Sequence, residues 1–186
     1  MPEYNLSERE ILLNTARETI AKQFDSHAKT DIDLSQYPEK LQQQRACFVT
    51  LHLEKRLRGC IGSLLARQPL ILDVIQNAYS AAFRDPRFKT VTLEEYPKLE
   101  LDISILSQAQ PLHFISELDL ISKLRPGIDG LILSDKGHRA TFLPSVWQEL
   151  PNPTVFLRHL KNKAGFTTDY WSDTLTIENY TTELIS

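Results

Sequence analysis

The spacing of apolar residues near the start of the chain predicts a helix. Ser7 and Glu10 form the sequence pattern of a capping box, and the apolar residues after them recur every three or four positions. Residues 25–44 are mostly polar, and this composition predicts a surface loop. The residues that would share the buried face of the helix are Leu13, Ala16, Ile20 and Phe24.

Two segments in which apolar residues alternate, 47–53 and 57–62, predict a β-hairpin. If Glu54-Lys55-Arg56 is a three-residue turn, residue 53 pairs with residue 57 and the rest of the register follows. One face of the hairpin is then apolar and turns toward the core. The other face carries Phe48, Thr50 and His52 from one strand and Arg58, Cys60 and Gly62 from the other. Cys47 lies on the core face, so we expect no disulfide between the two cysteines.

The rest of the pattern alternates helices with short strands and a second hairpin. This order favours an α+β fold with a mostly antiparallel sheet over a doubly wound parallel sheet. Two hairpins that each lead toward a helix also point to a degenerate duplication. The predicted elements are a helix from Pro69 to Asp85, a strand at 99–105, a helix at 116–124, a hairpin of 127–134 with 139–143, a helix at 152–165 and a strand at 174–180.

Composition and charge are those of an ordinary globular protein. The 186 residues are 41% hydrophobic and 24% charged, with a net charge of −3. This length suits one domain, 1–186, with or without a smaller lobe. Basic residues are scattered, so we do not expect nucleic-acid binding. We expect a cytoplasmic protein, because a membrane-spanning run, a signal peptide and a disulfide framework are all missing from the pattern.

The segment Leu57-Arg58-Gly59-Cys60-Ile61-Gly62 carries the most distinctive chemistry of the chain. Glycine within a strand indicates that another group approaches the backbone closely, and a nearby cation favours the thiolate form of a cysteine. These features predict an accessible thiol at Cys60 as a candidate nucleophile, with His52 as its candidate base diagonally across the hairpin. The alternative is that Cys60 is simply a packed residue, a common role for a free cysteine.

Three arginines, Arg58, Arg87 and Arg139, form a second candidate group. Guanidinium groups bind carboxylates and phosphates through paired hydrogen bonds, so together these residues would bind a small anionic ligand. The other candidate contacts of that ligand are Thr50, Gly59, Gly62 and Asp85.

Both groups of residues also have purely structural explanations. Internal ion pairs would explain the arginines, with Asp102 and Asp129 as possible partners. Asp85 equally fits a turn in which its side chain bonds to backbone amides. The histidines and cysteines lack the spacing of a metal site, and no phosphate-binding glycine loop occurs, so we expect neither a metal nor a cofactor.

Six motifs occur in one order along the chain: Cys47-Phe48-Val49-Thr50-Leu51, the segment 57–62, Asp85-Pro86-Arg87-Phe88, Gly127-Ile128-Asp129-Gly130, residues 139–144 and Lys163-Ala164-Gly165. This series resembles the AMMECR domain family, protein A of the Amme–Memo–radical-SAM system, from about Leu6 to Tyr180. The resemblance implies an α+β fold with a larger and a smaller lobe and a cleft where the signature residues meet. It also implies a cytoplasmic location and Memo-like and radical-SAM partner proteins, but no defined reaction. One departure is Arg45-Ala46-Cys47, where relatives favour a glycine.

Two functions are consistent with these observations. The first is an enzyme-like domain that binds a small anionic metabolite or nucleotide-like ligand in a cleft, with Cys60 as a thiol for group transfer. The second is a non-catalytic adaptor for a Memo-like or radical-SAM protein. In the adaptor, the glycines would let the partner's backbone approach, and Cys60 would only pack.

Overall fold

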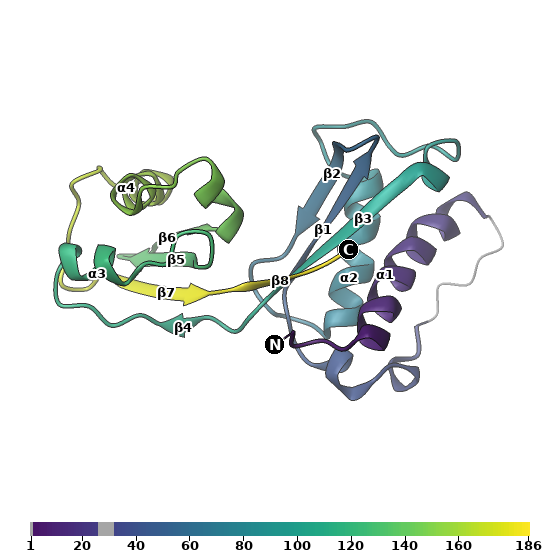
Figure 1. The fold of residues 1–186 in the computed structure, drawn as a ribbon, viewed down its shortest axis with the longest axis horizontal. Coiled ribbons are helices and arrows are strands. Elements are labelled where there is room, and N and C mark those ends of the chain that lie inside the picture. The colour runs from purple at the N-terminus through teal and green to yellow at the C-terminus, as the bar shows by residue number, and fades with distance from the viewer. Residues whose placement is uncertain (1, 26–31) are drawn as a thin grey trace. The chain divides into compact units, whose positions relative to one another are not determined.

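The computed structural model describes residues 2–25 and 32–186, which form two compact units. The first unit contains the described residues up to Leu106 together with Glu183–Ser186, and the second contains Ser107–Thr182. Each unit combines helices with a four-stranded antiparallel sheet, so the fold is α+β, as the sequence predicts (Figure 1). Within the described ranges, no helix is both long enough and apolar enough to cross a membrane.

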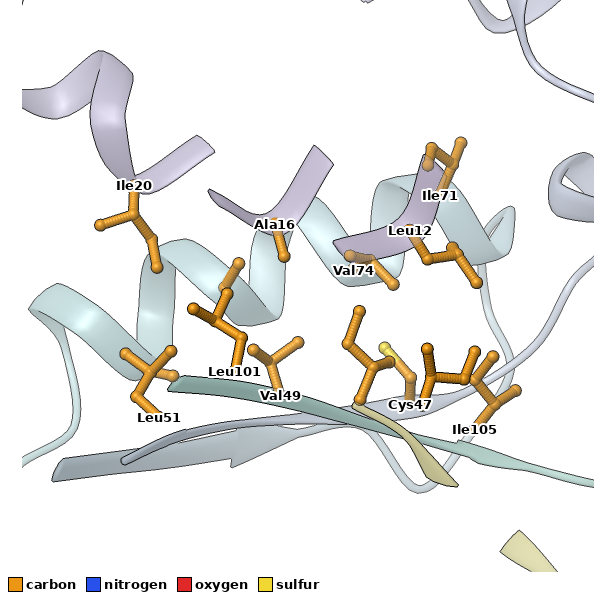
Figure 2. Packing of buried hydrophobic residues seen from close by; sticks show 14 of the residues in the cluster. Leu12, Ala16, Ile20, Cys47, Val49, Leu51, Ile71, Val74, Leu101 and Ile105 are labelled. Carbon is orange, nitrogen blue, oxygen red and sulfur yellow. The ribbon is translucent and has the colours of Figure 1, made fainter. Parts of the chain in front are cut away.

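The first unit packs two helices against one face of its sheet. Alternation along the strands turns every second side chain toward these helices, and Cys47, Val49 and Leu51 are completely buried. Figure 2 shows these side chains meeting those of the two helices to form the core. The strand order is β2-β1-β3-β8, with β1 at Cys47–Leu53, β2 at Arg56–Gly62, β3 at Leu99–Leu106 and β8 at Thr182–Ile185; the helices are α1, Leu6–Ala21, and α2, Leu70–Phe83.

Helix α1 begins two residues earlier than the capping pattern predicts. The capping box consists of Asn5 and Glu8, not of Ser7 and Glu10. Asn5 Oδ1 accepts the Glu8 N–H at 2.9 Å, and Glu8 Oε2 accepts the Asn5 N–H at 2.8 Å. Asparagine caps a helix about as well as serine does, so either residue could have been the N-cap. In the structure the upstream residue, Asn5, is the cap. After Ala21, the chain continues into a 3-10 helix at Lys22–Phe24.

The segment that the polar composition assigns to a loop is partly helical. Leu34–Gln36 and Glu39–Gln42 form 3-10 helices, and Leu41 is completely buried in the first core. One apolar residue therefore anchors this stretch although its neighbours are polar. The central part of the predicted loop, residues 26–31, lies outside the described residues.

The first hairpin has a tighter turn than predicted. Only Glu54 and Lys55 form the loop, both with positive φ (51° and 64°), so Leu53 pairs with Arg56. An irregularity beside Leu51 then adds one residue to β2 and restores the predicted register, in which Thr50 pairs with Cys60. The extra residue is Arg58. Two-residue turns with positive φ match the twist of antiparallel strands, which explains why the shorter loop forms.

The second unit repeats the arrangement of helices on one face of a sheet. Alternating residues of its strands, such as Leu131, Leu133 and Ile177, pack against α3 and α4. The strand order is β4-β7-β5-β6, with β4 at Gln110–Pro111, β5 at Gly130–Asp135, β6 at His138–Phe142 and β7 at Thr176–Tyr180; α3 is Glu117–Lys123 and α4 is Pro153–Lys163. Short 3-10 helices occur at Tyr96–Lys98 in the first unit and at Pro144–Gln148 in the second.

Candidate functional site

Thr50, His52 and Cys60 lie on the side of the first sheet opposite α1 and α2, whereas Gly59 faces α2. Because the register at Cys60 is as predicted, Cys60, Thr50 and Asp102 form one row across β2, β1 and β3. His52 lies on the same side, two residues along β1 from Thr50. We call this side the polar face and define it by Phe48, Thr50, His52, Cys60, Asp102 and Ser104, all of which are partly exposed.

The two cysteines have opposite environments. Cys60 is partly exposed, and its Sγ accepts a hydrogen bond of 3.3 Å from the Thr50 hydroxyl. Cys47 is completely buried in the core (Figure 2), and this burial, followed by the nearby charge of Asp73, raises the pKa of its thiol well above the ordinary value. The prediction that the two thiols lie on opposite faces is confirmed. Cys60 therefore carries the accessible thiol of the chain.

Asp85 and Arg87 hold the backbone of Cys60 from the outer edge of β2. Asp85 accepts the Cys60 N–H at 2.9 Å, and Arg87 Nη2 donates to the Cys60 carbonyl at 3.0 Å. The two side chains also form an ion pair, with 2.7 Å between Arg87 Nη2 and Asp85 Oδ2. β2 is an edge strand, so these contacts satisfy backbone groups that another chain could otherwise pair with.

The electrostatics of this pair extend to the thiol. Hydrogen bonds from Arg87, together with backbone N–H groups, lower the pKa of Asp85 strongly, so its carboxylate stays charged although it is buried. The pKa of Arg87 is raised, chiefly by hydrogen bonds to Asp85 and to a smaller extent by its interaction with Cys60. The arginine that contacts Cys60 is therefore Arg87, through the Cys60 carbonyl, whereas the sequence had pointed to Arg58.

Arg58 is committed to an internal ion pair. Its Nε and Nη2 lie 3.0 Å from the two carboxylate oxygens of Glu95, and its side chain is only 13% exposed. It also donates to the carbonyls of Lys89 and Thr90. These bonds leave little capacity for a ligand, so the structural explanation applies to Arg58. The partner is Glu95, and the prediction that Asp102 could serve was wrong.

The two glycines of the motif make room for the protein itself. A Cβ atom at Gly59 would lie 2.2 Å from the backbone oxygen of Ala81 in α2. A Cβ atom at Gly62 would lie equally close to the ring of Phe48. The close approach that these glycines indicate is real, but the interpretation that they leave space for a ligand or a partner's backbone was wrong.

His52 contacts a carboxylate and not the thiol. Its Nδ1 lies 3.4 Å from Asp102 Oδ2. Within the described part of the chain, no hydrogen bond joins His52 to Cys60. The structure therefore brings together Cys60, Thr50, Asp85 and Arg87, and it places His52 beside them on the same face without direct contact.

The remaining arginine and aspartate predictions concern the second unit. Arg139 lies on β6, and its Nη2 is 3.9 Å from Glu178 Oε2, so this pair is close but not hydrogen-bonded. Asp129 is completely buried and pairs with Arg125 at 2.6 Å, so its predicted pairing with one of the three candidate arginines was wrong. Among the described residues, no cluster of His, Cys, Asp or Glu has the geometry of a metal site.

Sequence reasoning missed Glu95, although a signal for it was present. Thr92 and Glu95 have the spacing of a capping box, and each side chain bonds to the other's backbone N–H. This turn places the Glu95 carboxylate where Arg58 can reach it. The spacing of Thr92 and Glu95 could be recognised in the sequence, but the position of their turn beside β2 could not.

Comparison with known proteins agrees with this description. The two units, each with an antiparallel sheet and helices on one face, define an α+β protein with a thiol-containing motif on an edge strand. The AMMECR1 family model matches residues 13–185, and the chain belongs to this family. The prediction of the family from the six motifs is therefore confirmed.

Relatives from several microorganisms support the assignment. The chain is 38% identical over 143 residues to Protein MJ0810 of Methanocaldococcus jannaschii, which covers 75% of this chain and 71% of that protein. A protein of Thermotoga maritima is 38% identical over 149 residues, 78% of this chain and 80% of its own. The crystal structure of the uncharacterized protein PH0010 from Pyrococcus horikoshii matches with a TM-score of 0.79 at 29% identity, over 96% of this chain and 90% of that one.

Proposed function

We propose that the protein binds a small acidic molecule at the polar face of the first sheet, with Cys60 Sγ as its reactive contact. The observation that carries this proposal is the setting of the Cys60 thiol. It is partly exposed, it accepts a hydrogen bond from Thr50, and it lies within electrostatic reach of Arg87. An accessible thiol beside a hydroxyl donor and a cation is the setting in which a cysteine can act as a nucleophile.

The acidic part of the ligand would be bound by Arg87. The side chain of Arg87 is 54% exposed, and its hydrogen bonds to Asp85 and Cys60 involve Nε and Nη2. No described residue accepts a hydrogen bond from Nη1, so this group can donate to an incoming carboxylate or phosphate. Asp85 holds the guanidinium in place, so the cation does not need to be ordered when the ligand binds.

In the group-transfer form of this proposal, the Cys60 thiolate attacks an acyl carbon of the ligand. A carbon–sulfur bond forms, the bond from that carbon to its leaving group breaks, and the leaving group takes the proton that the thiol has lost. No oxidant or reductant is needed. His52 remains the candidate base in this proposal. Asp102 orients its ring, and His52 lies on the same face as the thiol.

Thiol labelling across a range of pH tests the proposal, and the protein contains its own control. We expect one thiol to react in the folded protein, to be lost in Cys60→Ser and to be retained in Cys47→Ser. Arg87→Gln should slow the labelling, whereas Arg84→Gln, the same change of charge on an exposed neighbour, should not. If both thiols reacted only after denaturation, or if Cys47→Ser removed the reactive thiol, the proposal would be wrong. In a separate experiment, native mass spectrometry of the purified protein, compared with Cys60→Ser, would identify a retained acidic ligand.

The adaptor function was favoured by the idea that the two glycines leave room for a partner's backbone. The structure does not support this idea, because α2 and Phe48 fill the space beside Gly59 and Gly62. Binding of a Memo-like or radical-SAM protein stays a prediction. A pull-down with the Arg87→Ala variant tests it: loss of a defined partner without any loss of thiol labelling would favour the adaptor.

A further inference from the structure

We infer that the second unit contains a separate site for a phosphoryl group, centred on Arg139 at the tip of the β5–β6 hairpin. The inference rests on contacts within the second unit only, so it stands or falls independently of the proposed function at Cys60. The site is a shallow hollow of 580 Å³. The residues that carry the argument are Ser134, Lys136, Gly137, Arg139 and Thr176.

The register of the second sheet places Arg139, Ser134 and Thr176 in one row, where the Thr176 hydroxyl already donates to the Ser134 carbonyl at 3.1 Å. Arg139 on β6 pairs with Ser134 on β5, and Ser134 pairs with Thr176 on β7. Directly paired residues point to the same side of a sheet. Because Leu133 and Ala140, the sequence neighbours of Ser134 and Arg139, face the helices, the row lies on the opposite, helix-free side.

Arg139 is the least committed of the three candidate arginines. Arg58 and Arg87 donate several short hydrogen bonds within the protein. Arg139 donates none within the described chain, its nearest carboxylate oxygen is 3.9 Å away on Glu178, and its side chain is 49% exposed. A guanidinium without a close partner, held on a rigid strand, is suited to a doubly hydrogen-bonded oxyanion.

The neighbouring groups favour a phosphoryl group over a carboxylate. The Ser134 hydroxyl has no hydrogen bond within the described residues. Lys136 is exposed in the turn, where its ammonium group lies 5.6 Å from the centre of the Tyr170 ring and has no ion-pair partner among those residues. These donors, added to the guanidinium, can serve the three terminal oxygens of a phosphoryl group, whereas a carboxylate has only two. Asp135 does not compete directly, because its two oxygens accept the hydroxyls of Tyr170 and Thr174.

Glu178 supplies a sharp test, because its carboxylate is the group that a phosphoryl ligand would replace. We would titrate the full chain with inorganic phosphate and record backbone amide resonances by NMR, with chloride added to hold the ionic strength constant. Saturable shifts confined to residues 134–139 and Thr176 are expected. Arg139→Gln should weaken binding about tenfold, and Glu178→Gln should strengthen it about threefold.

The matched control is Arg158→Gln, which removes the same charge from an exposed position on α4 of the same unit. It should leave the affinity nearly unchanged, and Arg139→Lys should bind with intermediate affinity because it keeps the charge without the paired donors. The inference is overturned if the shifts do not saturate, if Arg158→Gln weakens binding as much as Arg139→Gln, or if Glu178→Gln has no effect. Unchanged spectra of the free variants would show that each is folded.

Discussion

Asp85 accepts a hydrogen bond of 2.9 Å from the backbone N–H of Cys60, across 25 positions of sequence. Through this bond, the Asp85-Pro86-Arg87 turn after α2 becomes part of the environment of the thiol on β2. The same carboxylate orients Arg87, which donates back to the Cys60 carbonyl. Two of the six motifs of the chain thus form one structural unit at the edge of the first sheet.

Replacing Asp85 by asparagine should destabilise the protein by about 2 kcal/mol at pH 7, because a buried charged acceptor is lost. The pKa of this carboxyl is lowered in the folded state, mainly by hydrogen bonds from Arg87. Its contribution is therefore complete above the unfolded pKa of about 3.9 and is lost as the pH falls further. Urea unfolding at pH 7 and pH 3 should show a smaller difference between variant and wild type at pH 3.

The control for this prediction is Asp119→Asn, which removes a carboxylate from a partly exposed ion pair with Lys123. It should change the unfolding free energy much less than Asp85→Asn does. An equal effect of the two variants, or an Asp85 difference that grows toward low pH, would contradict the role assigned to Asp85.

Gly59→Ala should destabilise the protein by about 3 kcal/mol, because the new methyl group would lie 2.2 Å from the Ala81 backbone oxygen and push α2 from the sheet. Gly127→Ala is the comparison. Gly127 has a positive φ of 78° but open space around it, so alanine there should cost only about 1 kcal/mol. Chemical denaturation of both variants measures the difference, and similar costs would show that space beside α2 is not limiting.

The turn of the first hairpin should be improvable. Glu54 and Lys55 both have positive φ, which Asn-Gly adopts far more readily. The double variant Glu54→Asn, Lys55→Gly should stabilise the protein by about 1 kcal/mol and raise the midpoint of thermal unfolding by about 3 °C. Lys55→Ala serves as the control, since alanine does not relieve positive φ. A lower midpoint in the double variant would mean that these side chains make contacts of their own.

Lys161 should be replaceable, whereas its partner should not. The Lys161 side chain is completely buried, and its Nζ lies 2.7 Å from Glu117 Oε1. Lys161→Met fills the same volume and leaves a carboxylate that water can reach, so the change in stability should be within about 1 kcal/mol. Glu117→Ala strands a buried ammonium group and should cost about 3 kcal/mol. Urea unfolding decides the order, and a larger loss in Lys161→Met would refute this asymmetry.

Much of the first hairpin could be predicted because strand periodicity is a local property. Alternation from Cys47 to Leu53 assigns each side chain to a face, and the pairing of Thr50 with Cys60 places the thiol on the polar side. The extra residue at Arg58 could not be predicted, because a shorter turn followed by an irregular pair gives the same register further along. The short strands β4 and β8 carried too few residues to show a pattern.

Repeat spacing and motif order were enough to predict the family, the α+β class and the face of each residue of β1, because neighbouring residues set these features. They did not reveal that the extra residue in β2 pairs Leu57 with His52 and leaves Leu57 42% exposed. The partners of individual groups became visible only in the folded chain: Glu95 pairs with Arg58, Asp85 binds the Cys60 backbone, and α2 fills the space beside Gly59. The difference lies in how far apart in the sequence the interacting residues are. A side chain's face follows from backbone geometry one or two residues away, but an ion pair or a close contact depends on where distant segments meet in space.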